Sequence, residues 1–129
     1  MGQIEYDYTV LVAIDFDGTL TKKDDFVNKD IKFNKTAVKW AKKIRKLNCK
    51  MILWTCRENE KLEIAINELK KIGLEFDYIN SDNGKRGEHK KISAEYYIDD
   101  RANDHKIRWR KIYKLIRKEV ARNDKSSII

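Results

Sequence analysis

The chain has 129 residues, of which 41% are hydrophobic and 39% are charged. This length suits one domain with one core, and the composition excludes a disordered chain. The apolar runs are too short for a transmembrane helix, and the first ten residues lack the basic and apolar regions of a signal peptide. We therefore expect a single domain over residues 1–129 that does not enter a membrane, with a frayed tail at residues 123–129.

The chain has two cysteines, Cys49 and Cys56, and they lack the spacing of a metal site. Such sparse cysteine usage is typical of proteins from reducing compartments. We therefore expect a cytoplasmic protein.

The formal net charge is +8, and the basic residues are concentrated in two stretches. Residues 35–50 contain seven lysines and arginines and no acid, and residues 106–125 contain nine against Glu119 and Asp124. One interpretation is a binding surface for nucleic acid or another polyanion. The other is that lysines cover the solvated faces of two helices. The sequence favours the second interpretation, because few aromatic residues are interspersed as in proteins that bind single strands.

The first half of the chain predicts a strand, a loop, a helix and a strand. Residues 8–14 are almost all apolar, as in a strand that is buried on both faces of a parallel sheet. Residues 18–33 are polar and irregular and predict a loop or a short flap. Apolar side chains recur at helical spacing over residues 36–47, and residues 50–55 predict a second buried strand.

The next segment predicts a helix, a strand and a loop. Residues 58–72 carry apolar side chains on one helical face, and Gly73 follows as the expected C-cap. Residues 76–80 predict a short strand. Residues 81–90 are rich in turn-forming residues and predict a loop.

A last strand over residues 95–99 and a last helix over residues 106–122 complete the pattern. Strands that alternate with helices are typical of an α/β protein, and right-handed crossovers between them produce a parallel sheet. We therefore expect a three-layer Rossmann-like sandwich with a mainly parallel sheet. Three tryptophans are expected in its core: Trp40, Trp54 and Trp109.

Acidic side chains follow two of the predicted strands. Asp15 and Asp17 come directly after the first strand, Asp99 and Asp100 end the last one, and Thr55 ends the strand between them. Carboxyl ends of parallel strands share one edge of a sheet, where ligands bind. Two carboxylates about 4 Å apart repel by about 4 kcal/mol, so such a cluster favours a bound cation. Oxygen ligands of this kind suit Mg²⁺. Taken singly, each Asp pair also suits a turn or a helix cap.

Four stretches resemble the ordered motifs of the haloacid dehalogenase superfamily of phosphotransferases. DFDGTL at residues 15–20 resembles the first motif, LWT at residues 53–55 the second, and YYIDD at residues 96–100 the fourth. The third motif is a lysine upstream of the fourth. Both Lys90 and Lys91 fit it, and we favour Lys91, which lies eight residues before Asp99.

The resemblance implies a Mg²⁺-dependent phosphatase that acts through an aspartyl-phosphate. Asp15 would be the nucleophile, and Asp17 would protonate the leaving oxygen and later activate water. Lys91 would offset the charge that develops on the transferred phosphoryl group. The carboxylates of Asp15 and Asp99 and the main-chain carbonyl of Asp17 would hold Mg²⁺, and Asp100 would either replace Asp99 as the ligand or support it from behind.

The phosphate would contact main-chain amides and the side chain of Thr55. Gly18 allows a close backbone approach, so its amide and that of Thr19 would face the phosphate oxygens. The amides near the following helix start, at Cys56 and Arg57, would add further donors. The Arg57 side chain is either a phosphate contact or an exposed charge, and the Cys56 side chain is interpreted as a small buried residue at a strand end.

Relatives in that superfamily that select small molecules carry an inserted cap domain. Residues 21–33 and 56–90 are too short for one, so we expect no cap domain and an open site. A second subunit of a homo-oligomer or a large substrate would close it. The phosphorylated substrate is then a sugar phosphate, a nucleotide or a nucleic-acid end. The alternative function is a non-catalytic phosphate-, polyanion- or nucleic-acid-binding protein on the same scaffold.

Overall fold

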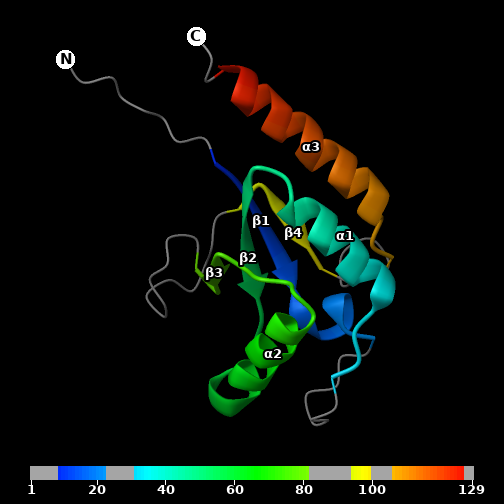
Figure 1. The fold of residues 1–129 in the computed structure, drawn as a ribbon, viewed down its shortest axis with the longest axis vertical. Coiled ribbons are helices and arrows are strands. Elements are labelled where there is room, and N and C mark those ends of the chain that lie inside the picture. Colours follow the sequence, from blue (N-terminus) through cyan, green and yellow to red (C-terminus); the bar gives the residue numbers. More distant parts are fainter. Residues whose placement is uncertain (1–8, 23–30, 82–93, 100–105, 127–129) are drawn as a thin grey trace, which may run out of the picture.

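The computed structural model describes residues 9–22, 31–81, 94–99 and 106–126 (Figure 1). Four strands are present in these ranges: β1 (Val10–Asp15), β2 (Cys49–Trp54), β3 (Tyr78–Ile79) and β4 (Tyr96–Ile98). Three α-helices accompany them: α1 (Lys35–Arg45), α2 (Asn59–Lys71) and α3 (Trp109–Ser126). A short helical turn, η1 (Phe16–Leu20), follows β1 directly.

The strands form one sheet in the order β3-β2-β1-β4, and every pair is parallel. This confirms the predicted fold class, a Rossmann-like α/β arrangement in which helices flank a parallel sheet. The chain proceeds from β1 to β2 to β3 in one direction and then places β4 on the other side of β1. The direction in which successive strands are added to the sheet therefore reverses between β1 and β4. Open α/β sheets bind ligands at this position.

The central strand β1 is buried on both faces, as its apolar sequence predicts. Val12 and Ile14 are fully buried in the main core beneath the helices, and Ala13 joins Ile52 in a smaller cluster on the opposite face. The helices α1 and α3 lie side by side over the main core (Figure 1). The rings of Trp40 and Tyr113 meet between them, with centroids 5.5 Å apart.

Local sequence signals explain most element ends. Asn34 caps α1, because its side-chain oxygen accepts hydrogen bonds from the amides of Thr36 and Ala37. Gly73 ends α2 with φ of 75°, a left-handed conformation that favours glycine, and confirms the predicted C-cap. At the other end of the chain, α3 continues to Ser126, so the expectation of a frayed tail from residue 123 is wrong for residues 123–126.

The structure corrects two expectations about side-chain burial. Cys56 is exposed, because β2 ends at Trp54 and Cys56 lies in the bend before α2. Trp109 is buried in the core as predicted, whereas Trp40 and Trp54 are only partly buried and pack against the edges of the two clusters. None of the described helices is long and apolar enough to cross a membrane.

Asp77 ties α1 and β2 to the segment that leads into β3. Arg45 donates to its two carboxylate oxygens at 2.6 and 3.1 Å, and the amide of Met51 donates at 2.8 Å. Burial alone would raise the pKa of the Asp77 carboxyl, but these donors, together with the charge of Lys50, hold it below the usual value of 3.8. The ionised side chain therefore stabilises the fold above that pH, and this stabilisation is lost as the pH falls below it.

We predict that Asp77→Asn lowers the free energy of unfolding by about 2 kcal/mol at pH 7, because hydrogen bonds to a charged group are lost. Urea titrations at a series of pH values measure this difference. The difference between wild type and variant shrinks below about pH 4. There the wild-type Asp77 carboxylate is protonated and loses its contribution, whereas the amide of the variant does not titrate. Glu75→Gln, a change at an exposed carboxylate of the same segment, serves as the control. A difference that stays constant down to pH 2 contradicts this account of Asp77.

Candidate functional site

Parallel pairing of β1 with β4 brings two of the predicted carboxylates to one place. The register pairs Ala13 with Tyr97 and Ile14 with Ile98, and one further step sets Asp15 opposite Asp99. Neighbouring strands lie about 4.8 Å apart, and residues opposite one another point to the same face. Both aspartates are partly exposed. Thr55 follows Trp54, the partner of Asp15 on β2, so three adjacent strands deliver polar side chains to this edge.

The turn after β1 has an irregular backbone that reverses the chain within a few residues. Asp17 has an extended ψ of 126°, and Gly18 has φ of 80°, so the glycine is required by the backbone. The Gly18 amide donates to the Thr21 hydroxyl at 3.0 Å, an intramolecular partner in place of the expected phosphate. The hydroxyl of the buried Thr19 donates to an Asp15 carboxylate oxygen at 3.4 Å.

Asp17 forms a buried, two-point salt bridge with Arg57. The Nε and Nη2 atoms of Arg57 donate to the two carboxylate oxygens of Asp17, each at 2.8 Å. Only 7% of the Asp17 side chain and 4% of the Arg57 side chain are exposed, so neither charge is shielded by solvent. The interpretation of Arg57 as an exposed charge is therefore wrong. Its guanidinium lies 5.1 Å from the centre of the Phe16 ring and also donates to the carbonyl of Lys61 at 3.3 Å.

Thr55 is fixed by a residue that sequence reasoning did not single out. Asn80 accepts a hydrogen bond from the Thr55 amide at 2.8 Å and donates to the Thr55 carbonyl at 2.9 Å. Asn80 has φ of 51°, a left-handed conformation that asparagine tolerates better than most residues. The Thr55 hydroxyl accepts from the amide of Arg57 at 3.1 Å, which orders the entry into α2. The sequence feature that could have drawn attention to Asn80 is its position at the end of a short predicted strand.

Three of the predicted site residues lie outside the described residues: Lys90, Lys91 and Asp100. Among the described residues, no group of three or more His, Cys, Asp or Glu side chains forms a metal-binding cluster. Asp15 and Asp99 directly follow the paired residues Ile14 and Ile98, so we expect their carboxylates to be close at the strand ends. Such a pair fits Mg²⁺, which takes one or two protein carboxylates and keeps several waters. This pair of carboxylates does not fit an ion that requires all of its ligands from the protein.

The buried Cys49 contributes no reactive group to this edge of the sheet. Burial raises the pKa of the Cys49 thiol to about 11, so it stays protonated at neutral pH. Cys49 lies at the start of β2, at the opposite end of the strand from Thr55.

Comparison with known proteins places the chain in a family but not in a functional class. No family model matches the sequence, and no curated protein matches it. A solved structure of a conserved protein from Bacteroides thetaiotaomicron is 32% identical in sequence, with a TM-score of 0.72. The alignment covers 86% of this chain and 92% of the other. The chain therefore belongs to the same family as that Bacteroides protein, and its α/β fold is a property of the family.

We predict that Arg57→Met lowers the free energy of unfolding by about 3–5 kcal/mol, because Asp17 is left as an unpaired buried charge. Lys71→Met is the matched control. It also removes one partner of a salt bridge, but the Lys71–Glu68 pair is exposed and contributes about 0–1 kcal/mol. Denaturant unfolding measures both variants. Equal losses for the two variants contradict a structural role of the buried pair.

Proposed function

We propose that the protein is a Mg²⁺-dependent phosphatase that hydrolyses phosphomonoesters through an aspartyl-phosphate on Asp15. The observation that carries this proposal is the register of β1 and β4, which ends with the pair Ile14 and Ile98, directly before Asp15 and Asp99, at the point where the strand order reverses. The resemblance of residues 15–20 to the first haloacid dehalogenase motif supports the same function.

The proposed reaction has two steps, and both use Asp15. A carboxylate oxygen of Asp15 attacks phosphorus, the bond from phosphorus to the substrate oxygen breaks, and that oxygen takes a proton from Asp17. Water then attacks the same phosphorus and gives a proton back to Asp17, which releases inorganic phosphate and the free Asp15 carboxylate. The Thr19 hydroxyl keeps the Asp15 side chain in place through its hydrogen bond.

In this proposal the carboxylates of Asp15 and Asp99 hold Mg²⁺ together with the main-chain carbonyl of Asp17, and Asp100 is the alternative ligand. The ion supplies positive charge that offsets the repulsion between the attacking carboxylate and the phosphate. Thr55 and the first amides of α2 contact the phosphate, and Lys91 offsets the charge that develops on it.

Arg57 connects the observed salt bridge to this chemistry. Because both oxygens of Asp17 accept hydrogen bonds from Arg57, proton transfer requires the guanidinium to leave Asp17. A phosphate at the strand ends offers Arg57 another two-point partner. We therefore place Arg57 on the phosphate when substrate is bound, which leaves Asp17 free to take up a proton from solvent and then donate it to the leaving oxygen.

The buried salt bridge also favours a second candidate, a protein that binds phosphate without turnover. In that case Asp17 serves only as the structural partner of Arg57. We place the protein in the cytoplasm under either candidate, because both cysteines are free thiols.

We predict that the protein hydrolyses p-nitrophenyl phosphate, that EDTA abolishes the activity and that added Mg²⁺ restores it. Asp15→Asn lowers kcat by a factor on the order of 10⁴ because the nucleophile is lost. Glu95→Gln changes a carboxylate at the amino end of β4 and retains the activity. A panel of sugar phosphates, nucleotides and 3′- or 5′-phosphorylated oligonucleotides then identifies the substrate class. Mg²⁺-dependent turnover that survives in Asp15→Asn rules out the proposed nucleophile, and phosphate binding without turnover supports the second candidate.

A further inference from the structure

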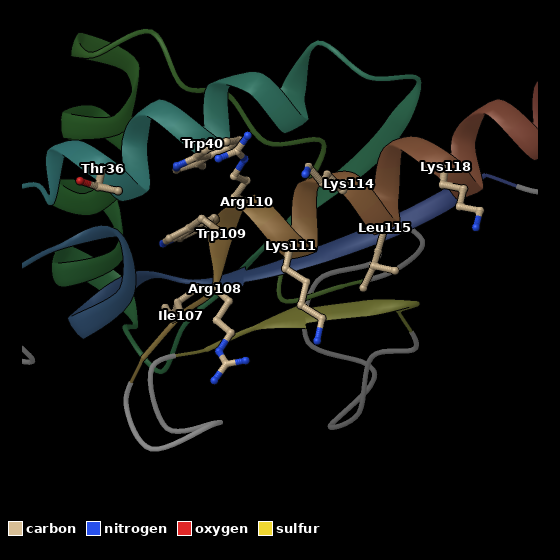
Figure 2. A pocket seen from close by; sticks show the side chains of 10 residues that line it. All are labelled: Thr36, Trp40, Ile107, Arg108, Trp109, Arg110, Lys111, Lys114, Leu115 and Lys118. Carbon is tan, nitrogen blue, oxygen red and sulfur yellow. The ribbon is translucent and has the colours of Figure 1, made fainter.

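An open groove of about 640 Å³ lies along α3 and the start of α1, and the candidate carboxylates do not line it (Figure 2). Half of the residues that line it are cationic: Arg108, Arg110, Lys111, Lys114 and Lys118. Leu115 stands among them and is 47% exposed. We call this surface the basic groove.

The cations follow the helical repeat of α3, so they form rows along its exposed side. Arg108, Lys111 and Lys118 are three and seven residues apart and share one stripe with Leu115. In Figure 2 their side chains extend from the helix into open space. Residues 106–118 contain no acid, and the five groove cations form no ion pair within the described part of the chain. The groove therefore has strong positive charge that no salt bridge among the described residues neutralises.

A general excess of lysine in the chain does not explain this charge. The helix α2 is also largely exposed on one side, yet its sequence contains three lysines and three glutamates. In contrast, α1 has five basic residues and no acid, and it packs directly against α3. Among the three described α-helices, the excess of positive charge is thus found in α1 and α3, the two helices that line the basic groove.

The aromatic rings near the groove are not available for stacking on bases. Lys43 lies over the Trp40 ring at 4.5 Å from its centre, and Lys39 lies at 5.9 Å. Trp109 is only 7% exposed. Proteins that bind unpaired bases use exposed aromatic side chains, whereas a row of cations contacts phosphates.

A membrane surface fits this groove less well than a chain of phosphates. Helices that lie in a membrane interface expose an apolar face. The apolar face of α3 is instead buried in the protein core through Trp109, Ile116 and Val120.

We propose that the basic groove binds the phosphate backbone of nucleic acid without reading its sequence. Arg108 and Lys118 are ten residues apart, which corresponds to about 15 Å along a helix. That length spans about four phosphate-to-phosphate steps of 3.4 Å along a duplex axis, and therefore about five successive phosphates of one strand. The proposal is independent of the phosphatase proposal, because it concerns a different surface.

Fluorescence anisotropy with labelled 20-base-pair DNA of two unrelated sequences, at 50–200 mM NaCl, tests the basic groove. Five phosphate contacts raise Kd about 500-fold over this range, and both sequences bind equally. Lys111→Gln combined with Lys118→Gln leaves three contacts and lowers that increase to about 40-fold. The matched control, Lys70→Gln combined with Lys71→Gln, removes two exposed charges from α2 and retains the wild-type salt dependence.

Circular dichroism confirms that both double variants are folded, and hydrolysis of p-nitrophenyl phosphate is expected to be the same in both. Equal salt dependence of the groove variant and the wild type overturns the proposal. An equal decrease in the salt dependence of Kd for the α2 control variant also overturns the proposal, because binding then depends on net charge alone. Binding to vesicles that contain phosphatidylserine, without binding to DNA, overturns it in favour of a membrane surface.

Discussion

The parallel pairing of β1 with β4 determines where the candidate functional side chains lie. It places two strand ends side by side at the reversal of the strand order, and each end carries an aspartate. A slip of one residue between these strands would move Asp99 to the opposite face of the sheet from Asp15. The buried side chains Val12, Ile14 and Ile98 prevent such a slip, because it would expose the apolar residues of β4. The core of the protein thus maintains the geometry of the edge at which we propose catalysis.

The second determinant is the buried pair of Asp17 and Arg57. It joins the turn after β1 to the entry into α2, so it links the first two strand ends of the site. A carboxylate that is held by a guanidinium is well positioned but not free to transfer protons. The same contact therefore stabilises the fold and, in the proposed mechanism, opens when a phosphate competes for Arg57. Stability and activity are expected to depend on the same residue for this reason.

Features set by short stretches of sequence were predictable, and features set by contacts between distant residues were not. The seven regular elements, the parallel sheet and the cap at Gly73 follow from apolar spacing and turn chemistry. The partner of Arg57 lies 40 residues earlier in the chain, and Asn80 reaches Thr55 across 25 residues. The contact between Asp17 and Arg57 has no local signature, and an asparagine at the end of a short strand does not by itself identify Thr55 as its partner. The exposure of Cys56 depends on the residue at which β2 ends, and strand ends are poorly determined by propensity. The parallel order of the strands that Asp15 and Asp99 follow was predictable, since it requires only strands that alternate with helices.

Chemical trapping of the proposed intermediate tests the central claim most directly. Turnover of a phosphomonoester in the presence of Mg²⁺ is stopped with borohydride, which reduces an acyl phosphate to an alcohol, and the digested protein is analysed by mass spectrometry. Our account predicts homoserine at residue 15 and at no other aspartate, with none formed in the absence of substrate. Hydrolysis that proceeds with residue 15 unmodified, or with the modification at a different carboxylate, would contradict it.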